Sequence, residues 1–159
     1  MTLPMTSSLN ETRNDTGRTA YCGPTVVSAI AGYSVAKVEA AICAHREGEE
    51  ARQRMIKGTT AEDVAAALAL FGYQMKRSQS FAHLERKERP TLWQWVQRPR
   101  SAFTYYLLGI HTRGGGHWVV VKGAKLLDTF TGGAWEFIAT GPHRGARIEE
   151  VFEVRPELP

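Results

Sequence analysis

The sequence contains only two cysteines among its 159 residues, which excludes two common classes of small protein. Two cysteines cannot build the disulfide framework of a small secreted domain. They form no Cys-x-x-Cys pair, and no His-x-x-x-His spacing accompanies them, so the pattern does not indicate a four-ligand zinc site. We therefore expect no metal and no cofactor.

Long apolar runs are also missing. No run approaches the roughly 18 residues that a membrane-spanning helix needs. Residues 1–15 lack the basic segment and apolar core of a secretory signal. We accordingly expect a cytoplasmic protein with no membrane partner.

An excess of one charge is absent as well. Lysine and arginine number 20 against 16 acidic residues, for a net charge of +4. The densest charged segment, residues 85–89, mixes both signs instead of forming a basic stripe. Because a nucleic-acid-binding domain needs a basic face, we rank such a domain last among the possible functions.

The pattern changes from helical to extended along the chain. Residues 1–13 are polar and predict a flexible N-terminal arm, followed by one domain over residues 14–159. Apolar periodicity and caps predict helices from Gly23 to Gly32, from Ser34 to about Arg46 and from Thr60 to Gly72, with a shorter helix within 91–97. Residues 73–78 predict a short strand. Glycine-bounded, β-branched or aromatic segments then predict the strands of an antiparallel meander: 102–110, 117–122, 125–130, 134–139 and 147–154. Helices before strands predict an α+β domain, with the N-terminal helices packed on one face of an antiparallel sheet.

Cys22 stands at the predicted start of the first helix. A helix N-terminus lowers a thiol pKa through its partial positive charge and free N–H groups, and the thiolate is the reactive form. Gly23 would leave space beside the sulfur for a substrate backbone. The alternative is a buried structural thiol, which is our interpretation of Cys43 in the middle of the second helix.

His117 differs from the other histidines because it opens the strongest predicted strand and follows the glycine run 114–116. If residues 123 and 124 form the turn of a hairpin, Val119 lies opposite Asp128, and His117 shares a sheet face with that carboxylate. Such diagonal neighbours are roughly 7–8 Å apart, within reach of a hydrogen bond. Alternatively, Asp128 caps the turn that follows it and His117 only edges the sheet.

These residues together resemble papain-like cysteine peptidases, and most of all the small branch that contains the leader-peptide peptidase domains of bacterial peptide exporters. The resemblance spans roughly residues 14–133 and rests on four segments: Cys22-Gly23-Pro24, Gly58-Thr59-Thr60, 116–121 and 128–132. It implies a papain-like fold with Cys22 as nucleophile, His117 as general base and acid, and Asp128 as the group that orients the imidazole.

The resemblance also implies an oxyanion donor and a substrate cleft. The family carries a Gln about six residues before the Cys, and this chain has Thr16 there instead. Asn14 and Thr16 are the candidates for that side-chain donor, and the backbone N–H of Cys22 would be the second donor. Gly23, Gly116 and Trp118 are the candidates for lining the cleft.

Two functions follow from the resemblance. The first is a thiol hydrolase that cleaves a peptide or isopeptide bond of a polypeptide substrate, or transfers the acyl group to an amine. The second is a weak or inactive scaffold that binds a partner protein, for example as a subunit of a phage or virus particle.

Overall fold

The computed structural model describes residues 22–46, 58–113 and 115–158. The predicted arm over 1–13 and both oxyanion candidates, Asn14 and Thr16, lie outside the described residues.

The helices begin and end close to the predicted signals. The three N-terminal helices are α1 (Cys22–Ala31), α2 (Val35–Arg46) and α4 (Ala61–Leu70). Gly32 and Gly72 follow α1 and α4 with positive φ angles of 78° and 86°, which glycine adopts without steric cost. Thr60 caps α4 in a reciprocal capping box with Asp63. The remaining elements are β1 (Tyr73–Ser80), η1 (Arg86–Glu88), α5 (Leu92–Val96), β2 (Tyr105–Thr112), β3 (Gly115–Lys122), β4 (Lys125–Leu127), β5 (Glu136–Phe137) and β6 (Arg147–Pro156).

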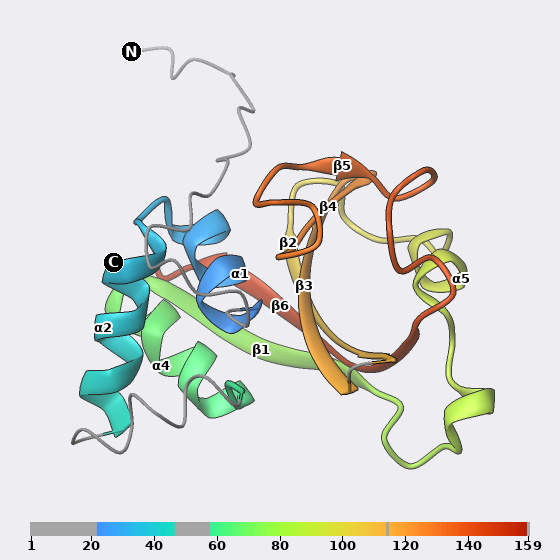
Figure 1. Ribbon diagram of the computed structural model, residues 1–159, viewed down its shortest axis with the longest axis horizontal. Helices are drawn as coiled ribbons and strands as arrows, with labels where there is room; N and C mark the ends of the chain where they lie inside the picture. Colours follow the sequence, from blue (N-terminus) through green and yellow to red (C-terminus); the bar gives the residue numbers. More distant parts are fainter. Residues whose placement is uncertain (1–21, 47–57, 114, 159) are drawn as a thin grey trace.

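The six strands of the described residues pair antiparallel in one sheet, in the order β1-β6-β2-β3-β4-β5 (Figure 1). The predicted meander is therefore correct for β2 to β5 and wrong for β6, which lies between β1 and β2. The reason is that β1 and β2 are separated by a long connection that contains α5, so they form no hairpin. The last strand occupies the place between them and satisfies the main-chain groups of both.

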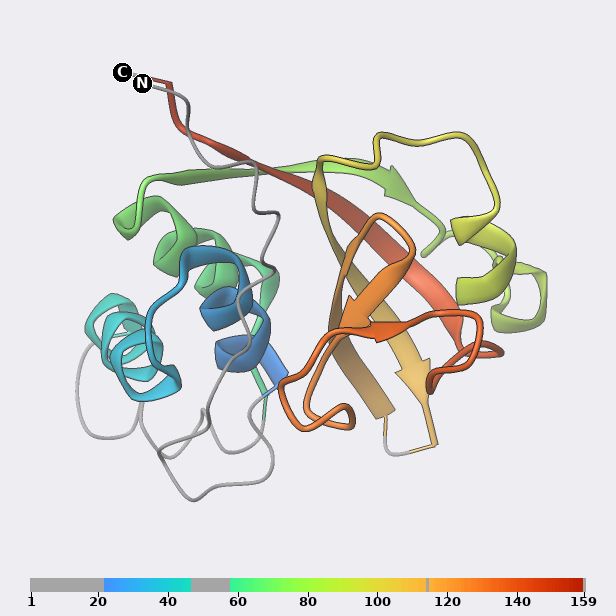
Figure 2. The ribbon, with the colours of Figure 1, turned by 90° about the horizontal axis from the view of Figure 1, so that it is seen from above.

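The sheet buries a hydrophobic cluster on each face. Along β3, Trp118 and Val120 pack with α1, α2 and α4, whereas Val119 and Val121 pack with α5. Figures 1 and 2 show the three N-terminal helices on one side of the curled sheet and α5 on the other. The alternation of side chains along a strand thus builds two cores, and the N-terminal helices cover one face as predicted.

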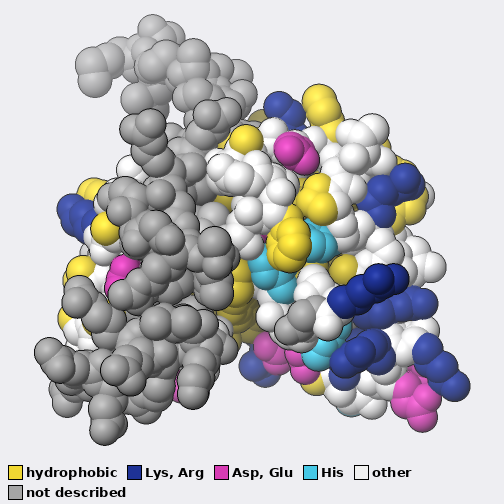
Figure 3. Space-filling model, viewed as in Figure 1, with side chains coloured by type: hydrophobic (Ala, Val, Ile, Leu, Met, Phe, Trp, Pro, Cys, Tyr) yellow, Lys and Arg dark blue, Asp and Glu magenta, His cyan; other side chains and the backbone are white. Residues whose placement is uncertain are grey.

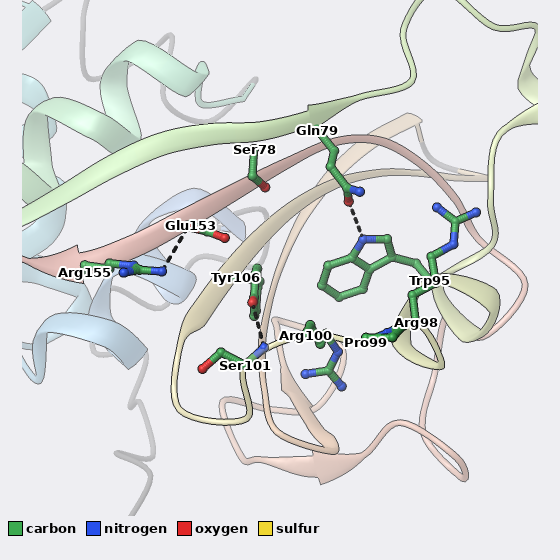
Figure 4. A pocket seen from close by; sticks show the side chains of 10 residues that line it. All are labelled: Ser78, Gln79, Trp95, Arg98, Pro99, Arg100, Ser101, Tyr106, Glu153 and Arg155. Atoms are coloured by element: carbon green, nitrogen blue, oxygen red, sulfur yellow. Dashed lines mark hydrogen bonds and ion pairs between the residues drawn. The ribbon is translucent and has the colours of Figure 1, made fainter.

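Side-chain hydrogen bonds hold α5 and the loop after it against the sheet. The indole of Trp95 donates to Gln79 Oε1 at 2.7 Å, and the main-chain N–H of Ser101 donates to the Tyr106 hydroxyl at 3.2 Å. Both bonds border a pocket of about 440 Å³ (Figure 4).

No single helix among the described residues is long and apolar enough to cross a membrane. By length and composition alone, α1 and α2 pass that test only as a pair, and they are bent by 113° at their junction.

Candidate active site

The N-terminus of α1 brings Cys22 against strand β3. β4 pairs only with residues 120–122 of β3, so among the described residues no strand pairs with that edge of β3 before Val120. α1 packs against β3, and the Cys22 sulfur is hydrogen-bonded to the His117 side chain and to the main chain at Trp118 and Gly23. Because β4 stops at Leu127, the N-terminus of α1 can reach the imidazole of His117.

The environment of Cys22 favours its thiolate. Burial by itself raises the pKa of this half-buried thiol, but the hydrogen bonds from His117, Trp118 and Gly23 outweigh it. The pKa of Cys22 consequently lies below its ordinary value. Cys43 is also partly buried, in the middle of α2.

The hairpin that joins β3 and β4 has the predicted register. Val120 pairs with Leu127 and Lys122 with Lys125, so Asp128 follows directly after β4 on the face that His117 occupies. His117 Nε2 lies 2.7 Å from Asp128 Oδ2. Because Nε2 is engaged with the carboxylate, Nδ1 is the ring atom left for the Cys22 sulfur.

The carboxylate stabilises a charged imidazole. Burial lowers the pKa of His117, but its bonds to Asp128 and Cys22 overcome this effect and raise the pKa to about 9. Burial likewise raises the pKa of Asp128, and the two histidines bonded to it reverse that effect and lower the pKa to about 2. The arrangement thus supports a thiolate–imidazolium pair backed by a buried anion.

Asp128 also caps the turn that follows it. Its Oδ1 accepts from the main-chain N–H of Thr131 at 3.0 Å, and its own N–H donates to the Thr131 hydroxyl at 3.1 Å. The sequence offered turn-capping and histidine-binding as alternatives, and the structure shows both.

His143 is a residue of the site that the sequence did not indicate. It lies between β5 and β6, and its Nε2 is 2.7 Å from Asp128 Oδ2. It belongs to the Gly-Pro-containing turn around residues 141–145, where no hydrophobic periodicity fixes the direction of a side chain. The only local signal was a histidine in a turn, which does not say what the ring contacts.

A pocket of about 200 Å³ opens beside the sulfur. It is bounded by Gly116 and Trp118, the expected cleft residues, and by Glu149 and Glu150, which the sequence did not indicate. Histidines gather near hydrophobic side chains at the centre of the face shown in Figure 3.

Gly23 does not line this pocket, contrary to expectation. It is buried, and a Cβ at this position would lie 2.5–2.8 Å from the side-chain atoms of Thr59. The missing side chain allows α1 to pack closely on the segment before α4, so the space beside Gly23 is filled by protein.

Within the part of the chain that the structure describes, His117, Asp128 and His143 form a group that could hold a metal ion. One ligand atom from each lies within 4.8 Å of the others. Both nitrogen–oxygen separations are 2.7 Å, however, which is the length of a charge-assisted hydrogen bond with the proton between the atoms. Two tetrahedral zinc ligands at roughly 2.0–2.1 Å from the ion would stand farther apart than this.

Comparison with known proteins yields a match in structure. No family model and no curated protein matches the sequence. Among solved structures, the chain is similar to the peptidase domain of Streptococcus ComA, a bi-functional ABC transporter involved in a quorum sensing pathway, with a TM-score of 0.58 and 15% identity. The match covers 93% of this chain and 99% of the ComA domain. The chain therefore has the papain-like α+β fold of this peptidase domain.

Proposed function

We propose that this protein is a cysteine hydrolase that cleaves a peptide or isopeptide bond through Cys22, His117 and Asp128. The observation that carries the proposal is the continuous chain of contacts from the Cys22 sulfur through the His117 imidazole to the buried Asp128 carboxylate. The similarity of the fold to the peptidase domain of Streptococcus ComA supports the proposal.

In the proposed reaction, the Cys22 thiolate attacks the carbonyl carbon and forms a C–S bond. The His117 imidazolium gives its proton to the leaving nitrogen as the C–N bond breaks, which leaves a thioester on Cys22. His117 then takes a proton from an incoming water, whose oxygen displaces the sulfur. An amine in place of that water would give acyl transfer instead.

The oxyanion needs donors in this scheme. The main-chain N–H of Cys22 opens α1 and has no partner within the helix, because the first four N–H groups of a helix lack one. Asn14 and Thr16 remain our candidates for the side-chain donor. The pocket bordered by Gly116 and Trp118 would receive the substrate backbone.

The rate of alkylation of Cys22 by iodoacetamide, followed by mass spectrometry from about pH 5 to about pH 9, tests the activated thiol. We expect a plateau well below the ordinary thiol pKa of about 8.5, because the ion pair holds the sulfur as thiolate. At about pH 6, Cys22 should react at least ~10-fold faster than Cys43, the internal control. His117→Ala should abolish the plateau and leave the circular dichroism unchanged. Equal rates for the two cysteines would contradict the proposal.

A second measurement separates a hydrolase from a scaffold. With p-nitrophenyl acetate, an active site should release a burst of nitrophenolate and then continue to turn over, whereas Cys22→Ser should show neither phase. A burst without turnover would favour the alternative of a catalytically weak subunit that binds a partner protein.

A further inference from the structure

Asp128 has two imidazole partners, and only one of them faces Cys22. Nε2 of His117 and Nε2 of His143 each lie 2.7 Å from the same oxygen, Oδ2. The Asp128 side chain is completely buried, and the His143 side chain is only 10% exposed. His143 therefore makes a buried, charge-assisted contact with the carboxylate.

The contacts of the carboxylate divide between its two oxygens. Oδ1 accepts from the main-chain N–H of Thr131, and Oδ2 accepts from the two histidines. During the proposed reaction His117 gains and loses a proton at Nδ1, so the strength of its bond to Oδ2 changes at each step. His143 takes no part in that proton transfer and supplies Oδ2 with a contact that persists throughout.

The backbone at His143 is held in an uncommon conformation. Its φ angle is 68°, in the left-handed region that non-glycine residues enter at a cost of roughly 1–2 kcal/mol. The ring is also fixed by packing, because the exposed Phe130 lies edge-on to both imidazoles, with centroid distances of 5.2 Å to His117 and 4.9 Å to His143. A strained residue that is packed and hydrogen-bonded at a candidate active site indicates a constraint beyond turn formation.

We propose that His143 is a positioning residue: its Nε2–H donates to Asp128 Oδ2 and keeps this oxygen directed at His117 Nε2. The inference rests on the proposed function, since the aligned carboxylate matters through the imidazole that serves Cys22. His143 acts only through Asp128 and does not touch the sulfur or the substrate in this scheme.

Two matched substitutions test the hydrogen bond. His143→Asn keeps a residue that tolerates a positive φ, but its side chain is too short to reach Oδ2. His143→Gln carries an amide N–H near the position of Nε2 and can restore the bond. We expect the Cys22 alkylation rate of the asparagine variant at about pH 6 to fall about 10-fold and its pH profile to shift to higher pH. Loss of the hydrogen-bond partner behind a metal-bound imidazole typically costs about 10–100-fold, and we take the lower end of that range for this site. The glutamine variant should stay within about 3-fold of the unaltered protein.

NMR of the histidine side chains tests the His143–Asp128 hydrogen bond independently of any rate measurement. In the unaltered protein both His117 and His143 should carry a proton on Nε2, whether or not Nδ1 is also protonated. In His143→Asn the pKa of His117 should fall from about 9 toward its ordinary value of 6.5, because Asp128 is less firmly aligned. A His143 ring with its proton only on Nδ1 would overturn the inference without any variant.

The remaining outcomes are equally decisive. If the alkylation profile of His143→Asn matches that of the unaltered protein, or if both variants are impaired to the same extent, the hydrogen bond has no positioning role. Stoichiometric zinc in the purified protein, lost on His143→Asn, would assign the histidine pair to a metal instead. If the alkylation rate of Cys22 in the unaltered protein shows no plateau with pH, the proposed function is wrong. The NMR measurement would still show whether His143 donates to Asp128.

Discussion

At the scale of single residues, Asp128 serves both the turn and the candidate active site because its two oxygens have different partners. Oδ1 binds the Thr131 N–H of the turn, and Oδ2 binds His117 and His143. The hairpin register predicted the side of the sheet on which this carboxylate lies, because side chains alternate along a strand. The second histidine could not be predicted in this way, since the loop between β5 and β6 has no periodicity.

Gly23 gives a residue-scale prediction with a matched control. Gly23→Ala should lower the free energy of unfolding by about 1–3 kcal/mol, because the new Cβ would lie 2.5 Å from Thr59 Oγ1 in a packed interface. Gly116→Ala adds the same methyl group where nothing lies within 4 Å, and it should leave the stability nearly unchanged. Urea unfolding of both variants checks this. Equal losses would show that the contact with Thr59 does not require glycine.

At the scale of elements, a largely buried ion pair joins α2 to the start of α4. Arg46, at the end of α2, is bonded to Asp63 in the first turn of α4, and its guanidinium also donates to the Gly58 carbonyl at 3.0 Å. The neighbouring Thr59 carbonyl accepts from the Trp118 indole at 2.9 Å. Because Gly58, Thr59 and Trp118 all line the pocket beside Cys22, this ion pair supports a wall of the candidate site.

Asp63→Asn should therefore destabilise the fold by about 3 kcal/mol, since it leaves the Arg46 guanidinium without its buried partner. The asparagine can still accept from Thr60, so the loss reports mainly the missing charge. Glu85→Gln is the control: it removes an ion pair with Lys87 in which both side chains are more than 70% exposed, and it should change the stability by less than about 0.5 kcal/mol. Chemical denaturation measures both. Similar small changes would mean that the buried pair contributes little.

At the scale of the whole molecule, two carboxylates with lowered pKa values contribute to the response to acid. Burial alone would raise the pKa of Asp63 and of Asp128, but their hydrogen bonds, to Arg46 and Thr60 in one case and to the histidines in the other, lower both values to about 2. The ordinary value of each is 3.8. Each contributes stability that is fully present above about pH 4 and is lost as the pH falls through about 2.

We therefore expect the free energy of unfolding to fall by a few kcal/mol between about pH 4 and about pH 2, because each shift is worth on the order of 2 kcal/mol. His117 has the opposite sign: its raised pKa contributes stability below about pH 6.5 that is lost as the pH rises through about 9. Urea unfolding across this range measures both limbs. In the double variant Asp63→Asn, Asp128→Asn, the free energy of unfolding should hardly change between about pH 4 and about pH 2. The loss of stability at alkaline pH should remain but be smaller. An unchanged acid limb in that variant would contradict the assignment.

Local sequence patterns predict strands and short hairpins, but they do not predict the order of the strands in the sheet. Each strand segment had the composition of a strand, and the β3–β4 hairpin followed from its short glycine-containing turn. The place of β6 between β1 and β2 is a pairing between distant segments, and the pattern of β6 fits any partner that buries the same face.

The sequence by itself determined the helices, the register of the hairpin and the side of the sheet shared by His117 and Asp128. These depend on caps, glycines and alternation, which act between residues close in the chain. Only the tertiary structure decided that α1 meets β3 where β4 ends, that Thr59 fills the space at Gly23, and that His143 reaches Asp128. Those contacts join segments tens of residues apart, or lie in loops without periodicity, so tertiary packing and long-range hydrogen bonds select them.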